Sequence, residues 1–422
     1  MVTNLEILSK EMIKPSSPTP HHLRNLQLSL LDQIVPSAYI PLIFFYNANQ
    51  LQSSNKDHPK IAQILKQSLS NVLTQFYPLA GGLTSEISSV DCNDSGALFV
   101  EAQVHTTLSE VTEKPIMEEL KQFVPLESNS RNAMDKPKTV VLAVQITFFD
   151  CGGIAVGVQI SHKIADGTSL VTFLNSWAAS CRGDDEHMLP PAFEWEKLAK
   201  LKQAAASAPG SKGNDPTRVE AVSAFIWSNF RTASNSKKMV TASHAVNLRP
   251  RMDPALPDVA FGNLWARTLP IMVAEEEREY HHLLDQLRNA IRKINSNFNA
   301  DEYLLHFLKS VELVPKGEIE NCSFTSWCRF PVYMVDYGWG KPKWVCTTTM
   351  PLKNLVILMS TSCGEGIEAW VNLLEEDLPR FLKVDVCCRF VAVECLVVVA
   401  ATQLHEHGLG MAVATFVVAA VA

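Results

Sequence analysis

A histidine and an aspartate stand four residues apart where an apolar stretch gives way to an expected helix. The stretch QISHKIADGTSL carries them as His162 and Asp166. An unperturbed imidazole has a pKa of about 6.5, so His162 is a candidate general base near neutral pH. At a strand end facing a cavity, it could deprotonate a hydroxyl or amine that attacks an acyl group. The pair also fits a second interpretation, in which His162 is a buried, hydrogen-bonded residue and Asp166 a helix N-cap.

The elements that position this pair follow from the pattern of apolar residues. Alternate residues from Ile154 to Ile160 are aliphatic, which predicts a strand whose inward-facing row His162 extends. A turn at residues 150–153 makes this strand the second of a hairpin. A helix is expected from about residue 168 to 181.

Strands and helices alternate in both halves of the chain. Asp57 as N-cap and Pro59 in the first turn predict a helix that ends near residue 76. Helical spacing of apolar residues predicts further helices over 219–230 and 280–294. Strands are expected at 97–104, 322–330, 356–361 and 366–373. This mixture predicts α/β layers.

Length and composition indicate a large globular protein. The chain has 422 residues, of which 47% are hydrophobic and 19% charged. We expect an N-terminal domain over 1–189, a crossover or linker over 190–215, a C-terminal domain over 216–384 and an atypical apolar tail over 385–422.

Several function classes are disfavoured by what the sequence contains. The net charge is -7 without a basic tract, which argues against a nucleic-acid partner. The ten cysteines form no CxxC pair and no His/Cys set with zinc spacing, so we expect reduced thiols, no metal site and a cytoplasmic protein. The N-terminus does not have the pattern of a secretory signal. The chain also lacks a GxSxG elbow, a GxxxxGK[ST] loop and a GxGxxG after a strand.

Two motifs in a fixed order carry a family resemblance. The first is HKIADG at 162–167, and the second is DYGWG at 336–340, with Tyr where the family pattern has Phe. Further segments in the expected order are SSPTP, YPLAG, PTRVEAVSAFIW, AVNLRPRMDPALP, FGN and GIEAWV. Over about residues 1–383 the chain resembles the BAHD family of plant acyltransferases. The clade that contains vinorine synthase and related alkaloid or alcohol O-acetyltransferases is the most similar.

The resemblance implies a fold and an activity. The fold would be a two-domain, mixed-sheet α/β acyltransferase, similar to chloramphenicol acetyltransferase, with a channel between the domains. The activity would be transfer of an acyl group, by clade resemblance acetyl, from acyl-CoA to a hydroxyl of an alkaloid or terpenoid alcohol. The enzyme would be a soluble monomer with no permanently bound cofactor, using acyl-CoA as a co-substrate.

The resemblance also implies roles for individual residues. The expected catalytic set is His162 as the base, with Asp166 and Asp336. Asp166 would hold its loop through an arginine, and Arg249 and Arg251 are both candidates. Gly167, Gly338, Trp339 and Gly340 would shape the two motif loops. Thr325 and Trp327 would line the acceptor pocket, although an ordinary strand with one buried Trp explains them equally well.

The chain departs from the family pattern in two places. The stretch from 190 to 216 is short, which would remove part of a crossover. Residues from about 386 onward become Val- and Ala-rich, and we expect them to lie outside the cooperative fold, as a translated intron or, less favoured, a membrane anchor. Two alternatives therefore remain open: an impaired homologue that only binds acyl-CoA or a partner, and an N-acyltransferase acting on amines.

Overall fold

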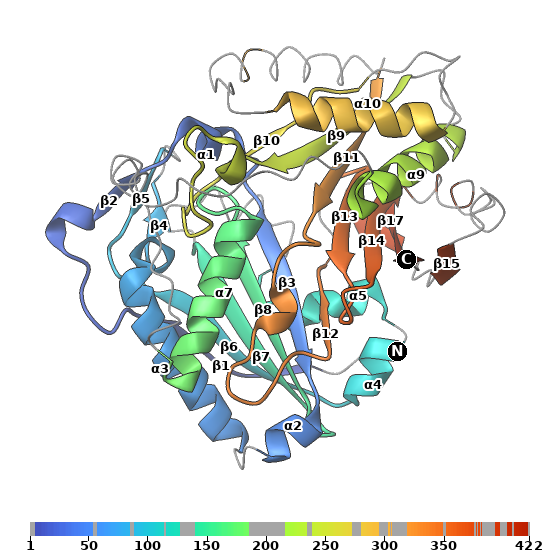
Figure 1. The fold of residues 1–422 in the computed structure, drawn as a ribbon. Coiled ribbons are helices and arrows are strands. Elements are labelled where there is room, and N and C mark those ends of the chain that lie inside the picture. The colour runs from blue at the N-terminus through green and yellow to red at the C-terminus, as the bar shows by residue number, and fades with distance from the viewer. Residues whose placement is uncertain are drawn as a thin grey trace. The chain divides into compact units, whose positions relative to one another are not determined.

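The chain divides into two compact units. Unit 1 consists of Met1–Glu194, Asp258–Asn263 and Phe330–Pro351, and unit 2 of Trp195–Pro257, Leu264–Arg329 and Leu352–Ala422. The protein is described from a computed structural model, shown in Figure 1, over residues 5–53, 57–84, 88–113, 115–126, 140–184, 216–233, 239–271, 280–294, 303, 305, 319–348, 352–374, 377, 379, 381, 393–396, 403–406 and 409–420. The expected crossover at 190–215 lies outside these residues.

Unit 1 is built on a six-stranded mixed sheet with the order β1-β6-β7-β8-β3-β12. Its strands are β1 (Leu5–Ile13), β3 (Tyr39–Tyr46), β6 (Ala97–Val104), β7 (Leu142–Phe149), β8 (Ile154–Ser161) and β12 (Trp344–Cys346). β7 and β8 form the expected hairpin, and every residue of both is buried. β12 comes from a distant part of the sequence and pairs antiparallel with β3, so residues beyond 330 complete this sheet.

Two long helices of unit 1 pack side by side (Figure 1). They are α3 (His58–Gln75) and α7 (Gly167–Arg182), and both predictions are confirmed. Asp57 caps α3 by accepting a hydrogen bond from the Lys60 N–H, 3.0 Å from its Oδ1. The indole Nε1 of Trp177 in α7 donates to the Ser68 Oγ of α3 over 3.1 Å. This contact ties the helix that follows His162 to the neighbouring helix.

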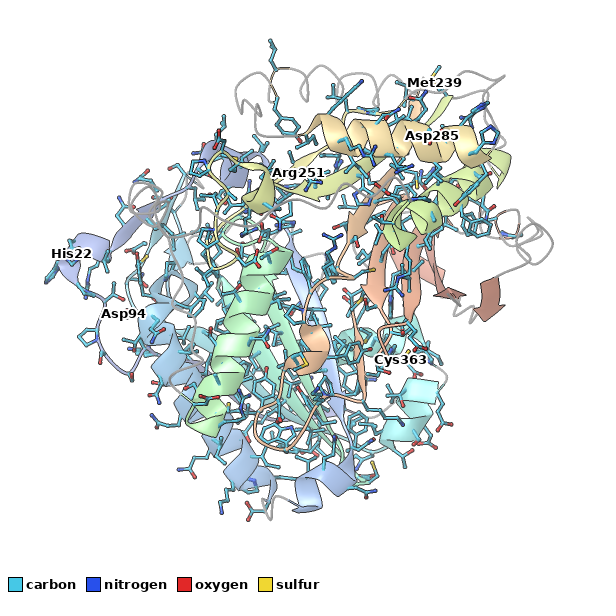
Figure 2. All side chains as sticks on the ribbon, in the orientation of Figure 1. His22, Asp94, Met239, Arg251, Asp285 and Cys363 are labelled. Atoms are coloured by element: carbon cyan, nitrogen blue, oxygen red, sulfur yellow. The ribbon has the colours of Figure 1, made fainter. Side chains whose placement is uncertain are left out.

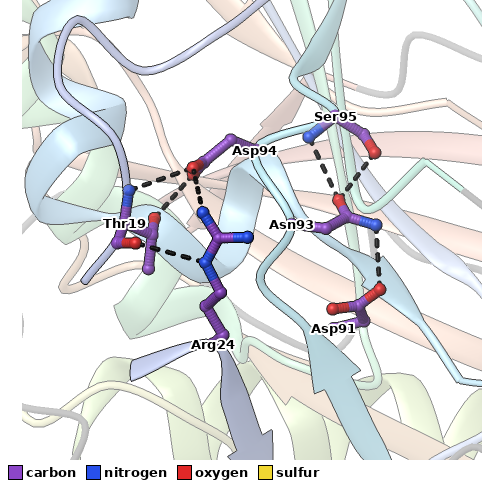
Figure 3. Close-up of polar contacts among 6 residues, drawn as sticks. All are labelled: Thr19, Arg24, Asp91, Asn93, Asp94 and Ser95. Atoms are coloured by element: carbon purple, nitrogen blue, oxygen red, sulfur yellow. Dashed lines mark hydrogen bonds and ion pairs between the residues drawn. The ribbon is translucent and has the colours of Figure 1, made fainter. Parts of the chain in front are cut away.

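A small sheet with the order β2-β5-β4 completes unit 1, from β2 (Asn25–Gln27), β4 (Gly82–Leu83) and β5 (Ser89–Asp91). The turn after β5 holds the N-terminal segment through Asp94 (Figure 3). The Asp94 carboxylate accepts hydrogen bonds from Thr19 N–H (3.0 Å) and Thr19 Oγ1 (2.6 Å) and lies 3.8 Å from the Arg24 guanidinium. We call this group the Asp94 clamp.

Unit 2 contains an eight-stranded sheet with the path β10-β9-β11-β13-β14-β17-β15, and β16 pairs with β17. The strands are β9 (Met239–Asn247), β10 (Trp265–Arg267), β11 (Ile319–Ser326), β13 (Leu355–Ser360), β14 (Gly366–Leu374), β15 (Val393–Leu396), β16 (Gln403–Glu406) and β17 (Leu409–Ala420). The sequence-based strand at 322–330 extends too far, because β11 ends at Ser326.

The tail of the chain contributes to this sheet. β17 pairs antiparallel with β14 along Gly366–Leu374. The expectation that residues from about 386 onward lie outside the fold is therefore wrong for β15, β16 and β17. The physical reason is that β14 would otherwise be an edge strand with unpaired N–H and C=O groups, which a Val-rich strand can satisfy.

The helices of unit 2 cover an apolar core, as their spacing predicts. α9 (Arg218–Ala233) packs against α10 (Tyr280–Lys293), and the buried cluster includes Trp227, Leu283, Leu287, Phe324 and Val356. On the opposite side of α10, Asp285 is exposed (Figure 2). Remaining elements are η1 (His21–Leu23), α1 (Leu30–Ile34), α2 (Ala48–Ser53), η2 (Tyr77–Ala80), α4 (Leu108–Glu113), α5 (Met117–Leu120), η3 (Lys121–Phe123), η5 (Arg249–Arg251) and η7 (Val332–Met334).

Candidate active site

His162 is the first residue after β8, at the start of a turn. The strand ends at Ser161, one residue earlier than the alternation of side chains suggested. The His162 N–H donates to the Ala38 carbonyl (2.8 Å), and the Ile164 N–H donates to the Ser161 carbonyl (3.1 Å). The main chain at His162 is therefore held both by its own turn and by the residue that precedes β3.

The imidazole of His162 has a defined tautomer. Its Nδ1 lies 3.0 Å from the main-chain carbonyl oxygen of Ala165. A carbonyl oxygen only accepts, so in the neutral ring Nδ1 carries the proton and Nε2 is the unprotonated nitrogen. Burial lowers the pKa of His162, against the opposing effects of Asp166, of main-chain hydrogen bonds and of the Asn263 side chain. As a whole residue His162 is partly accessible, and its ring, with a pKa below the usual value, is neutral near pH 7 and able to accept a proton through Nε2.

Asp166 acts on helix α7. It is the N-cap residue, and its Oδ1 accepts a hydrogen bond from the Ser169 N–H over 2.8 Å. Its negative charge lies at the positive end of the helix, where it is stabilising. Gly167 is the first residue of the helix. The N-cap interpretation of Asp166 is therefore correct, and it is compatible with a catalytic role for His162.

Arg249 and Arg251, the expected partners of Asp166, lie in η5 of unit 2 (Figure 2 labels Arg251). The Arg249 side chain is fully buried, and the main-chain N–H of Arg249 donates to the Asn247 Oδ1 over 3.0 Å. A guanidinium nitrogen of Arg251 donates to the Asn247 carbonyl over 3.1 Å. The interaction of either arginine with Asp166 stays a prediction.

Asp336 organises the loop that carries the second motif. Its Oδ1 accepts hydrogen bonds from the N–H groups of Gly338 (2.8 Å), Trp339 (3.1 Å) and Gly340 (2.8 Å). Gly338 and Gly340 have φ angles of 98° and 102°, which glycine adopts far more readily than other residues. A guanidinium nitrogen of Arg182, at the end of α7, donates to the Asp336 carbonyl. The carboxylate thus closes the loop on itself, which supports the architectural role implied by the resemblance.

An aromatic group anchors this loop within unit 1. The Tyr337 ring packs edge-on against Trp177 with a centroid distance of 4.9 Å, and Tyr46 contacts both Tyr337 and Trp339. The Tyr46 hydroxyl donates to the Val335 carbonyl over 2.9 Å. The loop is therefore fixed to β3, which pairs with β8 in the sheet, and to α7, the helix that follows His162 in the sequence.

Thr325 and Trp327 lie in unit 2, at the end of β11 and directly after it. Thr325 is partly accessible and shares one face of the strand with Ser323 and Asn321. The Asn321 Nδ2 donates to Ser323 Oγ over 2.9 Å, so this face is polar. Trp327 is buried, and its main-chain N–H donates to the Leu358 carbonyl over 2.7 Å. Their predicted contact with an acceptor stays a prediction.

Asp32 and Asn263 were not singled out from the sequence, yet the structure connects both to His162. Asn263 Nδ2 donates to the His162 carbonyl over 2.7 Å and to Asp32 Oδ1 over 2.9 Å. A signal was present in the Ser29-x-x-Asp32 spacing, which is that of a helix N-terminal capping box. The FGN motif contained Asn263 but gave no indication of what its amide contacts.

Among the residues that the structure describes, no group of three or more His, Cys, Asp or Glu side chains could hold a metal ion. In the same residues, every helix is too short or too polar to cross a membrane.

Comparisons with known proteins extend over nearly the whole chain. A model of the Transferase family matches residues 3–201 and 194–385. Stemmadenine O-acetyltransferase of Catharanthus roseus is 42% identical over an alignment length of 418, and the alignment covers 90% of this chain and 96% of that protein. Vinorine synthase of Rauvolfia serpentina is 40% identical over 413 residues, with the same coverage of 90% and 96%.

Solved structures agree with the sequence comparisons. The crystal structure of vinorine synthase superimposes with a TM-score of 0.77 at 37% identity, covering 89% of this chain and 96% of the other. The structure of F. sporotrichioides TRI101 complexed with coenzyme A and T-2 matches with a TM-score of 0.59 at 19% identity, covering 85% and 97%, and shows a shared fold. The expected two-domain α/β acyltransferase fold is confirmed. The chain belongs to the Transferase family, the BAHD acyltransferases, and is itself an acyltransferase.

Proposed function

We propose that the protein transfers the acetyl group of acetyl-CoA to a hydroxyl of a specialised plant metabolite, such as an alkaloid or a terpenoid alcohol. The donor and the acceptor class are supported by the names of stemmadenine O-acetyltransferase and of salutaridinol 7-O-acetyltransferase. The latter is 31% identical over an alignment length of 460, which includes gaps and covers 89% of this chain and 96% of that protein. The observation that carries the mechanism is the contact of His162 Nδ1 with the Ala165 carbonyl, because it leaves Nε2 as the proton acceptor.

The proposed reaction has one base and no covalent enzyme intermediate. His162 Nε2 takes the proton of the acceptor hydroxyl while the oxygen attacks the thioester carbonyl of acetyl-CoA. The tetrahedral intermediate collapses, its C–S bond breaks, and the thiolate takes the proton from the imidazolium. The products are the acetyl ester and coenzyme A with a free thiol, so atoms and charge balance.

The other motif residues serve this base indirectly. Asp166 fixes the start of α7 and with it the turn that contains His162, and Asp336 shapes the loop of the second motif. Thr325 and Trp327 are proposed to contact the acceptor. We propose a monomeric cytoplasmic enzyme; seven described cysteines, all with free thiols, are compatible with a reducing compartment.

The test is thiol release from acetyl-CoA with a panel of alkaloid and terpenoid alcohols, and with amines in parallel. His162→Ala should lower kcat by about 10²–10⁴-fold without unfolding the protein. His105→Ala is a matched control, since His105 Nδ1 also contacts an oxygen acceptor, Asp150 Oδ1 at 3.2 Å, but on the surface. This control should retain wild-type activity. A His162→Ala variant with more than about a tenth of the wild-type kcat would refute the assignment. Transfer only to amines would replace the O-acyl proposal by N-acyl transfer.

A further inference from the structure

A chain of buried hydrogen bonds connects the start of helix α1 to the main chain of His162. Asp32 Oδ1 accepts from both the N–H and the Nδ2 of Asn263, each over 2.9 Å. Asn263 Nδ2 also donates to the His162 carbonyl over 2.7 Å. Asp32 is 7% exposed and Asn263 1%, so water competes little for these bonds. We call these contacts the Asp32–Asn263 bridge.

The acidic end of the bridge is itself immobilised. Asp32 Oδ2 accepts from the Ser29 N–H (2.9 Å) and the Ser29 hydroxyl (2.6 Å), and the Asp32 N–H donates to Ser29 Oγ (3.2 Å). This is a capping box at the N-terminus of α1, so the carboxylate cannot rotate without breaking the helix cap. A helix cap and a contact to the catalytic turn thus share one carboxylate.

The segment that carries Asn263 is fixed from a second side. Ser169 Oγ lies 3.0 Å from both the N–H and the carbonyl of Gly262, accepting from the first and donating to the second. Ser169 is also the residue whose N–H is bound by Asp166. Residues 258–263 therefore connect α1, the His162 turn and the first turn of α7.

These contacts hold the main chain from which the imidazole of His162 extends. With its N–H bound to Ala38 and its carbonyl bound to Asn263, the main chain of His162 is held on both sides. A base must reach the acceptor hydroxyl at hydrogen-bond distance, and a displacement of about 1 Å can cost on the order of 10²-fold in rate. Resting on the proposed role of His162 as the base, we propose that Asn263, aligned by Asp32, is a positioning residue that holds His162 in its reactive place.

The Asp32–Asn263 bridge should also affect the pKa of His162, which can be measured. The Asn263 side chain raises the pKa of His162, in opposition to the larger lowering by burial. The ionisable groups around the turn are Asp166, which also raises this pKa, Lys163, whose Nζ donates to the Gln33 carbonyl, and Asp32, the acidic end of the bridge. Loss of the Asn263 amide should therefore both loosen His162 and lower its pKa further, which a purely structural residue would not do.

The experiment measures kcat, KM and the pH dependence of kcat/KM for four variants in the full-length chain. Asn263→Ala should lower kcat by about 10–100-fold, leave KM for acetyl-CoA within about two-fold, and move the acidic limb of kcat/KM to lower pH. Asp32→Asn should act in the same direction but more weakly, because the amide keeps one acceptor oxygen. Asp94→Asn is the matched control, since it weakens another carboxylate contact of unit 1, the part-buried Asp94 clamp (Figure 3), and should lower the melting temperature without moving the pH limb.

His162→Ala, the fourth variant, separates failure of this inference from failure of the proposed function. If His162→Ala is inactive while Asn263→Ala keeps the wild-type kcat and pH limb, the bridge has no positioning role. If His162→Ala is active, the proposed base is wrong. If Asn263→Ala does not fold, Asp32→Asn is the variant that tests the positioning role. A wild-type kcat and a wild-type pH dependence of kcat/KM in Asp32→Asn would then overturn the inference.

Discussion

The carboxylate of Asp166 binds the main-chain N–H of Ser169, with Oδ1 2.8 Å from the nitrogen. An aspartate four residues after a candidate base suggests a relay pair, but this contact assigns the carboxylate to the cap of α7. The imidazole obtains its orientation from the Ala165 carbonyl instead, 3.0 Å from Nδ1. The two motif residues therefore have separate structural partners.

The first prediction follows from this cap. Asp166→Asn retains a capping oxygen but loses the negative charge at the helix N-terminus, so we expect a loss of about 1 kcal/mol in the free energy of unfolding, together with reduced kcat. Asp57→Asn at the cap of α3 is the matched control and should affect stability alone. Thermal melts and initial rates measure both. A slower Asp166→Asn enzyme with unchanged melting would instead indicate a direct electrostatic role.

The second prediction concerns the loop that Asp336 closes. Asp336→Ala removes the acceptor of three N–H groups, each bond to a charged group contributing on the order of 1–3 kcal/mol. We expect a lower yield of folded protein or a higher KM for acetyl-CoA, and a milder effect for Asp336→Asn. Steady-state kinetics on the folded fraction provide the check. A pure kcat defect with normal folding and KM would contradict the architectural role.

The third prediction compares two tyrosines of one aromatic group. The Tyr337 hydroxyl is buried and has no hydrogen-bond partner among the described residues, whereas the Tyr46 hydroxyl donates to the Val335 carbonyl. A buried unsatisfied hydroxyl costs about 1–3 kcal/mol, so Tyr337→Phe, which restores the family motif, should raise the free energy of unfolding. Tyr46→Phe should lower it by about 1 kcal/mol. Urea unfolding of both variants tests the pair, and effects of the same sign would disprove the interpretation.

The fourth prediction is a pH dependence. Burial lowers the pKa of His162 below its usual value, so kcat/KM should be constant above about pH 6.5 and fall about tenfold per pH unit on the acidic side of a lower midpoint. The fold favours the neutral ring, so its contribution to stability is intact above the unfolded pKa of about 6.5 and is lost as the pH falls through the folded value. Rates and urea midpoints in a buffer series between about pH 5 and pH 8 measure both. An acidic limb centred above 6.5 would exclude a burial-lowered His162 as the base.

The sequence by itself determined the local elements near the site. The spacing of apolar residues, with Asp57 and Pro59 at one helix start and Asp166 at another, was sufficient for α3 and α7. The motifs at 162–167 and 336–340, with the further segments in the expected order, were sufficient to predict the family, and the comparisons confirmed that prediction. The helices and the two motifs depend on residues that are close together in the sequence. Their side-chain types and spacing can therefore be recognised without the tertiary structure.

Tertiary structure alone decided which distant segments meet. Residues 258–263 and 330–351 belong to unit 1 although unit 2 surrounds them in the sequence, and the Asn263 amide contacts both Asp32 and the His162 carbonyl. β17 pairs with β14 although its composition suggested a segment outside the fold. Such contacts depend on main-chain donors and acceptors that every residue possesses. Sequence patterns therefore do not identify the partners, which are selected only when the packed elements bring particular groups within hydrogen-bond distance.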